Sequence, residues 1–117
     1  MDFKITKYAD YTLIKVLNDR LDTSNAPDLK SELVVIHTKG EKNIILDVSS
    51  CDYCDSSGLS AILVANRLCE DAIGTFILTG LKPDVEQIIR ISMLHTVLTI
   101  TKTVDEAVNI LNEKEKH

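Results

Sequence analysis

The sequence predicts a single α/β domain, residues 1–117, built on a mixed sheet of roughly four to five strands with about four helices. Short aliphatic runs typical of buried strands alternate with longer segments of helical spacing, which favours parallel strands joined by helical crossovers. At the start, two β-prone runs (3–7 and 11–17) are separated only by Tyr8-Ala9-Asp10. Because this spacing is typical of a hairpin, we expect an antiparallel pair to open an otherwise largely parallel sheet.

The first helix should follow a loop formed by residues 18–22. Residues 23–25 are Thr, Ser and Asn, which are favourable N-cap types, and Pro27 suits the opening turn. Gly40 stands where a C-cap glycine would end the helix. The apolar positions that recur at helical spacing are Ala26, Leu29, Leu33 and Ile36.

The middle of the chain predicts a buried strand at 43–48 and a helix from about residue 57 to residue 71. This central helix is apolar around most of its circumference, so we expect it to contact protein on several sides. The remaining predicted elements are a strand at 75–78, a helix opened by Pro83, a strand at 97–100 and a last helix that carries Val104, Ala107, Val108 and Leu111.

Composition and charge exclude several classes of protein. A net charge of −5 disfavours a surface for nucleic acid or anionic lipid, since both need clustered Lys and Arg. The sequence starts without the apolar region of a signal peptide, and its uncharged runs fall short of the ~20 residues that span a bilayer. Three cysteines without an export signal suggest reduced thiols. We therefore expect a cytoplasmic domain without membrane insertion, whose charged tail (113–117) frays.

One stretch, residues 51–59, joins the predicted central strand to the central helix. Asp55, Ser56 and Ser57 are its best N-cap residue types. A small hydroxyl would lie at the positive end of a helix, where a phosphate is stabilised. The chain has neither a P-loop lysine motif nor a glycine-rich loop for ATP. We therefore expect not an enzyme but either a phosphate acceptor or a plain helix cap.

These residues resemble a known family. Residues 55–59 after a strand, with Arg20-Leu21-Asp22 upstream, are similar to the anti-sigma-factor antagonists, which are STAS domains, and the resemblance runs nearly end to end. It implies that the unphosphorylated chain binds an anti-sigma factor with serine kinase activity and so frees a sigma factor. Phosphorylation of Ser56 would release the chain, and a serine phosphatase would reset it. Ser57 is the alternative acceptor.

The resemblance also implies a partner-binding surface at one rim of the sheet. Ordinary helix capping would explain the presence of Asp22, Thr23 and Ser24 equally well. No cofactor or metal is implied, and the free chain is expected to be a monomer. The residues implied are Asp22, Thr23, Ser24, Asp55, Ser56, Ser57, Gly58 and Leu59.

One position departs from the family pattern. Where the family has a glycine before a leucine at the end of the third helix, this chain has Ser92-Met93-Leu94. Glycine adopts the left-handed backbone conformation at little cost, whereas methionine does not. We therefore expect the third helix to end differently.

Cys51 and Cys54 form a C-x-x-C pair that is not part of the family signature. Structural zinc needs four ligands, and the remaining candidates (Cys69, His37 and His95) lack a ligand spacing. A thioredoxin-like redox pair would place its first cysteine at the start of the helix, but Asp55 and Ser56 occupy that place here. We therefore expect buried thiols that act as small hydrophobic residues.

Two other functions stay open on the sequence alone. A STAS domain could be a structural subunit of a lipid transporter or of a signalling assembly. Cys51 and Cys54 could instead make the chain a thiol oxidoreductase. A pulldown from the native cytosol would separate the antagonist from the structural subunit. Recovery of a histidine-kinase-like ATPase would indicate the antagonist, and recovery of a membrane transporter would indicate the structural subunit.

Overall fold

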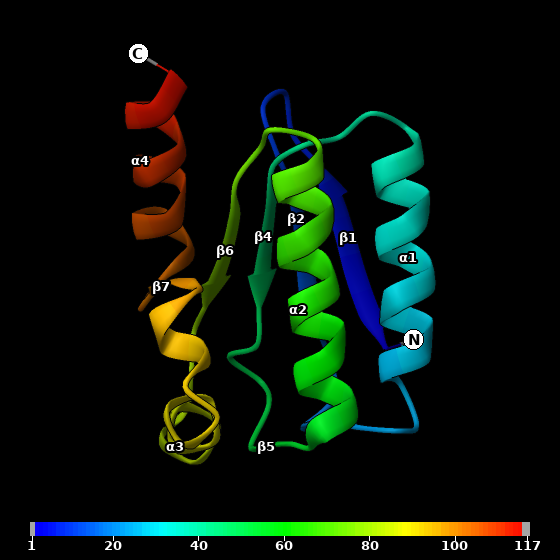
Figure 1. The fold of residues 1–117 in the computed structure, drawn as a ribbon, viewed down its shortest axis with the longest axis vertical. Coiled ribbons are helices and arrows are strands. Elements are labelled where there is room, and N and C mark those ends of the chain that lie inside the picture. The colour runs from blue at the N-terminus through cyan, green and yellow to red at the C-terminus, as the bar shows by residue number, and fades with distance from the viewer. Residues whose placement is uncertain (1, 116–117) are drawn as a thin grey trace.

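The computed structural model describes residues 2–115, which form a five-stranded sheet and a separate two-stranded sheet. The strands of the large sheet lie in the order β1-β2-β4-β6-β7 (Figure 1). β1 and β2 are antiparallel, and the other neighbouring pairs are parallel. The large sheet consists of β1 Phe3–Lys7, β2 Thr12–Val16, β4 Ile44–Asp47, β6 Phe76–Thr79 and β7 Thr99–Thr101, and the small one of β3 Arg20–Leu21 and β5 Tyr53–Cys54.

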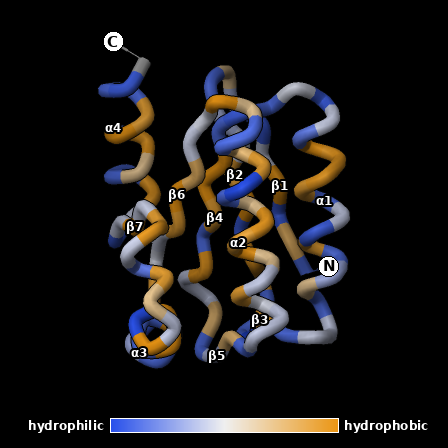
Figure 2. The backbone as a smooth tube through the Cα atoms, viewed as in Figure 1, coloured by the Kyte–Doolittle hydropathy of each residue, from blue (hydrophilic) through white to orange (hydrophobic). Residues whose placement is uncertain are grey.

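Helices cover both faces of the large sheet. α1, α2 and α3 supply residues to the main apolar core, and α4 supplies residues to a smaller core. β4 shows the division, because Ile44 and Leu46 belong to the main core while Ile45 belongs to the smaller one. Figure 2 shows apolar residues along the central strands and on the helices that cover them. The helices are α1 Ala26–Thr38, α2 Ser56–Asp71, α3 Pro83–Ile91, the short 3₁₀ helix η1 Leu94–Thr96, and α4 Val104–Glu115.

The predicted fold class, a mixed sheet opened by an antiparallel hairpin and combined with four α-helices, is confirmed. Two boundaries differ from the prediction. β7 begins only at Thr99, because η1 precedes it and leaves Val97 60% exposed. α4 continues through residue 115, so residues 113–115 are helical where a frayed tail was expected. Residues 116 and 117 of that tail lie outside the described residues.

Three helices end with a left-handed residue directly after the C-cap. The backbone φ is +88° at Gly40, +58° at Ile73 and +65° at Met93. After α2, the N–H groups of residues 73 and 74 donate to the carbonyls of Glu70 and Cys69, at 3.0 and 2.7 Å. This is the bonding pattern of a Schellman motif, which satisfies carbonyls at the end of a helix.

The expectation that α3 would end differently from the family pattern is wrong. Met93 takes the left-handed conformation, and its N–H donates to the Arg90 carbonyl at 3.0 Å. The conformation costs a residue with a Cβ about 1–2 kcal/mol. It is accommodated here because the Met93 side chain is largely exposed and displaces no core residue.

Ile73→Gly should stabilise the protein by about 0.5–1 kcal/mol. Ile73 is 90% exposed, so little packing is lost, and the strain of a β-branched residue at positive φ is relieved. The greater flexibility of unfolded glycine offsets part of the gain. Urea unfolding would measure the change. As the control, Ile91→Gly within α3 should lose about 0.5 kcal/mol, and a loss of stability in both variants would contradict the strain at Ile73.

Candidate functional site

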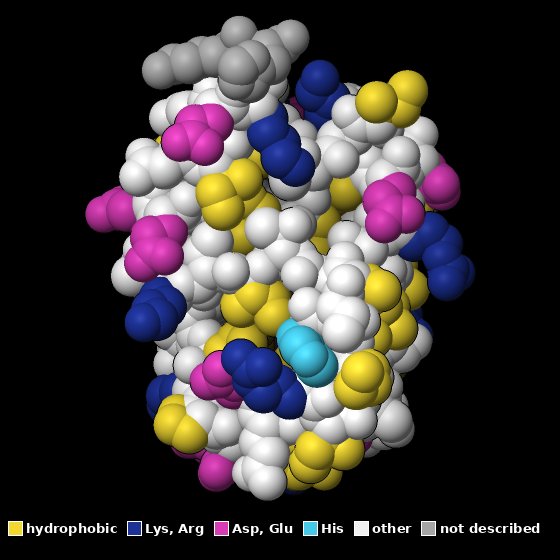
Figure 3. Space-filling view, turned by 60° about the vertical axis from the view of Figure 1, so that its left-hand side comes forward, with side chains coloured by type: hydrophobic (Ala, Val, Ile, Leu, Met, Phe, Trp, Pro, Cys, Tyr) yellow, Lys and Arg dark blue, Asp and Glu magenta, His cyan; other side chains and the backbone are white. Residues whose placement is uncertain are grey.

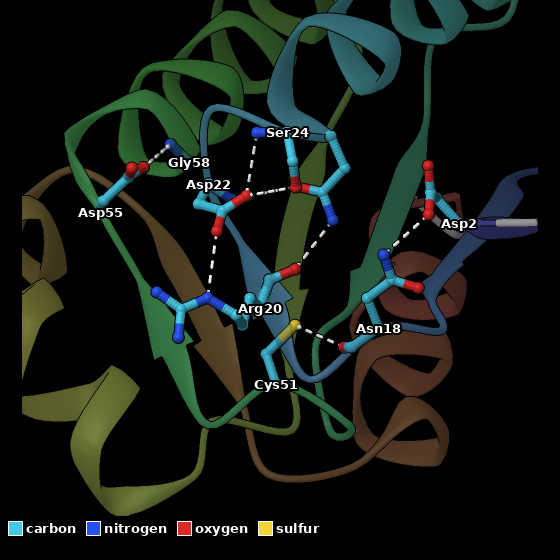
Figure 4. A network of polar contacts seen from close by, with 9 residues as sticks. Asp2, Asn18, Arg20, Asp22, Ser24, Cys51, Asp55 and Gly58 are labelled. Carbon is cyan, nitrogen blue, oxygen red and sulfur yellow. Dashed lines mark hydrogen bonds and ion pairs between the residues drawn. The ribbon is translucent and has the colours of Figure 1, made fainter.

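The small sheet brings together the loop that precedes α1 and the loop that precedes α2. β3 and β5 pair in parallel, with Arg20 opposite Tyr53 and Leu21 opposite Cys54. At the end of this ladder the Asp55 N–H donates to the Leu21 carbonyl at 3.2 Å. Residues 22–24 and 55–59, here called the two-loop surface, therefore lie on adjoining segments (Figure 4).

Asp22 organises the loop that leads into α1. Its Oδ1 accepts hydrogen bonds from the Ser24 N–H at 2.9 Å and from the Ser24 hydroxyl at 2.6 Å, and its Oδ2 accepts one from Arg20 Nε at 3.0 Å. Asn25 is the N-cap of α1, but its side chain makes no cap bond. It accepts instead from the Asp22 N–H and donates to the Arg20 carbonyl, which ties β3 to α1. Thr23 is exposed beside this network.

The hydrogen bonds from Ser24, and then from Arg20, hold the pKa of Asp22 below its ordinary value. Because the folded pKa is lowered, the stabilisation is present above the unfolded pKa and is lost as pH falls through the folded pKa. The Arg20 guanidinium also lies 4.4 Å from the centre of the Tyr53 ring, a cation–π contact. The loop is thus ordered around an ionised Asp22 at neutral pH.

Ser56 is the first residue of α2 and is exposed. Asp55 is the N-cap, and its Oδ1 accepts the Gly58 N–H at 3.0 Å. Ser57 is only partly exposed. Within the described residues, neither serine hydroxyl makes a hydrogen bond. The Ser56 hydroxyl is therefore accessible, next to backbone N–H groups that a helix leaves without partners in its first turn.

Gly58 allows α2 to lie against β3 and β5. It is buried, and a Cβ at this position would collide with the Leu21 carbonyl oxygen and come within 2.6 Å of the Cys54 sulfur. Side chains larger than hydrogen would push the start of α2 away from the small sheet. Gly58 thus sets the distance between the two halves of the two-loop surface.

Gly58→Ala should destabilise the protein by about 1–3 kcal/mol, the range for overpacking. In an open helix the same change would be stabilising by about 1 kcal/mol, so the sign of the effect tests the contact with Leu21. Ser60→Ala, in the next turn of the same helix, is the control and should be nearly neutral. Chemical denaturation would measure both variants, and a more stable Gly58→Ala would contradict the close packing.

The sequence model of the STAS domain family matches residues 4–107. This chain belongs to the STAS domain family. BtrV of Bordetella bronchiseptica, named "Putative anti-sigma factor antagonist", is 30% identical over 98 residues, which are 84% of this chain and 84% of BtrV.

Solved structures share the fold of this STAS domain. SpoIIAA in its unphosphorylated form, an anti-sigma factor antagonist, matches with a TM-score of 0.74 at 19% identity and covers 94% of this chain and 97% of its own. The phosphorylated form of Bacillus SpoIIAA matches with a TM-score of 0.73 at 22% identity, over 93% and 98% of the two chains. A sulfate transporter family protein from Wolinella succinogenes matches with a TM-score of 0.82 at 17% identity, over 96% and 93%.

The cysteines of this STAS domain are buried free thiols. Burial raises the pKa of Cys51 to about 11 and the pKa values of Cys54 and Cys69 to about 12. Because the thiolate is the reactive form, these values weigh against a redox pair at neutral pH. Among residues 2–115, no three His, Cys, Asp or Glu side chains are grouped so as to hold a metal ion. His37 and His95 lie on separate elements, α1 and η1.

Two contacts beside the two-loop surface were missed by the sequence analysis. Arg20 stacks on Tyr53, and Lys82 Nζ forms an ion pair with Asp52 Oδ1 at 3.0 Å. The second contact ties the start of α3 to the loop before β5. Arg20-Leu21 pairs a charged residue with an apolar one, which is typical of a half-buried strand, but Tyr53-Cys54 carries no charge. Two residues are in any case too few to predict a strand.

In the part of the chain that the structure describes, none of the helices has both the length and the apolar character that a membrane span requires.

Proposed function

We propose that this STAS domain is an anti-sigma factor antagonist whose two-loop surface binds an anti-sigma factor, and that phosphorylation of Ser56 ends that binding. The relative BtrV carries the name of such an antagonist. The observation that carries the proposal is the exposed Ser56 at the first position of α2, capped by Asp55 and next to the loop of residues 22–24.

Ser56 suits a phosphate acceptor better than Ser57 does. Its side chain is exposed, whereas Ser57 is partly covered by its surroundings. A kinase must bring the γ-phosphate of ATP into line with the attacking hydroxyl, and the more exposed hydroxyl meets that demand at lower cost. The partner kinase would supply ATP and Mg²⁺, so this chain needs no cofactor and is not itself an enzyme.

A phosphate on Ser56 would change the charge of the surface without unfolding it. It adds about −1.5 to −2 charges, and the free N–H groups at the start of α2 would stabilise it by about 0.3–1 kcal/mol. Asp55 precedes it directly, and Asp22 lies on the adjoining loop. The surface would therefore become strongly negative, and like-charge contacts would disfavour a partner that fits the unmodified form.

A serine phosphatase would return the chain to the binding form. Both reactions would take place in the cytoplasm, with the free chain as a monomer. The alternative, a structural STAS subunit of a transporter, is favoured only by the shared fold of the Wolinella succinogenes protein. This alternative assigns no role to the exposed hydroxyl of Ser56.

Affinity capture from an extract of the source cells tests the proposal. The tagged wild-type chain should retain an ATPase of the histidine-kinase type, and adding ATP should release it with one phosphate located on residue 56 by mass spectrometry. Capture of a membrane transporter in its place, with no phosphate on the chain, would favour the structural subunit and overturn the proposal.

A further inference from the structure

A hollow of about 640 Å³ lies at the β7 edge of the large sheet and shares no residue with the two-loop surface. α3, η1, β7 and the first turn of α4 line it. Figure 3 shows a hollow with apolar side chains at its floor and with histidine, basic and acidic side chains around its rim. Its volume falls within the roughly 300–1,000 Å³ of pockets that hold small ligands.

The floor of the hollow belongs to the main core. Ile89 and Leu98 are buried core residues, while Leu81 and Ile100 are partly buried and pack against the same core. Their positions are fixed by that packing. An apolar group placed in the hollow would remove the remaining exposed surface of Leu81 and Ile100 from water, which favours binding.

Two cations, Arg90 and Lys102, lie on the rim of the hollow. Arg90 directs Nε and Nη2 at a single oxygen of Glu86, both at 3.3 Å; the Arg90 side chain is largely exposed and that of Glu86 is about half-exposed. Such an exposed ion pair is weak, so the guanidinium can turn to a ligand at little cost. Lys102, which directly follows β7, forms no ion pair within the described residues.

His95 adds an imidazole ring to the rim. Its Nδ1 is buried and has no hydrogen-bond partner among the described residues. Nε2 is therefore the ring nitrogen that remains to meet a ligand.

The charges of the rim select the ligand. Glu86 and Glu106 line the same hollow as Arg90 and Lys102, so the formal charges of these four side chains cancel. A doubly charged phosphate would therefore leave more charge unmatched than a single carboxylate does. We propose that this hollow binds a small carboxylic acid with an apolar body. Arg90, Lys102 and His95 hold its carboxylate, and the apolar body lies on the floor.

Titration of the ¹⁵N-labelled full chain with hexanoate tests the proposal. Hexanoate should shift amide resonances of residues 81–106 in a saturable way, with a dissociation constant on the order of 1 mM for a ligand of this size. 1-Hexanol, which keeps the apolar body and lacks the charge, should bind at least about tenfold more weakly, and Arg90→Gln should weaken hexanoate by a similar factor. Arg67→Gln, an exposed arginine on α2, is the matched control and should leave the affinity unchanged.

Any one of four results would overturn the proposal. Hexanoate could fail to cause a saturable shift in residues 81–106. Hexanol could bind as tightly as hexanoate, or Arg90→Gln could leave hexanoate binding unchanged, in which case the hollow is merely apolar. Inorganic phosphate could displace hexanoate at equal concentration, in which case the rim does not select a single charge.

Discussion

Ser56→Ala should bind the partner kinase as the wild type does and should stay bound when ATP is added. The Ser56 side chain is exposed and its hydroxyl makes no hydrogen bond within the described residues, so its removal should change affinity by no more than about 2–3-fold. Without the acceptor oxygen, no phosphate can be added at this position. The wild type should instead lose at least about 100-fold in affinity on phosphorylation. Calorimetric titration before and after incubation with Mg-ATP would measure both values.

Ser56→Asp should weaken binding even without ATP. Aspartate places one negative charge near the position of the phosphate, but with less charge and fewer acceptor oxygens. It should therefore reproduce the phosphorylated state only in part, with an affinity between those of the two wild-type forms. If Ser56→Asp binds as tightly as the unmodified wild type, charge at this position is not what ends the complex.

Ser57→Ala is the matched control for the acceptor. Asp55, not Ser57, caps α2, so this change should cost little stability. The variant should still take up phosphate and dissociate. If Ser56→Ala is still phosphorylated and Ser57→Ala is not, the acceptor is the second serine. If both variants dissociate on adding ATP as the wild type does, the phosphorylation switch fails and the structural STAS subunit becomes the better account.

The fold could be predicted where the signal spans several residues. β4 and β6 each begin with three consecutive apolar residues, and the helical spacing in α1 and α2 repeats over several turns. The pairing of β3 with β5 could not be predicted, because each strand has two residues and pairs across more than thirty positions of sequence. Their position depends on the packing of Leu21 and Cys54 into the main core, which is a property of the whole fold.

The sequence predicts that residues 22–24 and 55–59 lie at one rim of the sheet, and the two segments adjoin in the structure, but the contacts within them could not be predicted. Cap-forming residue types at 22–25 and 55–57 indicated two helix starts, yet the role of each depends on three-dimensional neighbours. Asn25 bonds to β3 instead of capping α1, and Asp22 holds Ser24 and Arg20. The conformation of Met93 likewise depends on its surroundings. Its intrinsic preference for a right-handed backbone is overridden by the hydrogen bonds that end α3.

The position of the two-loop surface depends on the packing of α2, and Ile62 lies at the centre of that packing. Its side chain is 0% exposed and belongs to the main core. α2 packs against both α1 and β6, so the side chains around Ile62 come from more than one element. Such surroundings can collapse only partly into the space that a smaller residue would leave, and the cost of a cavity is added to the loss of apolar burial.

Ile62→Ala should therefore lower the free energy of unfolding by about 2–5 kcal/mol. Urea denaturation at constant m-value would measure the loss. Lys82→Ala removes only an exposed ion pair with Asp52, and it should cost about 0–1 kcal/mol. Arg67→Ala, on the exposed side of the same helix, should be nearly neutral. A loss below about 0.5 kcal/mol for Ile62→Ala, within the scatter of surface substitutions, would mean that α2 is not held between the sheet and α1.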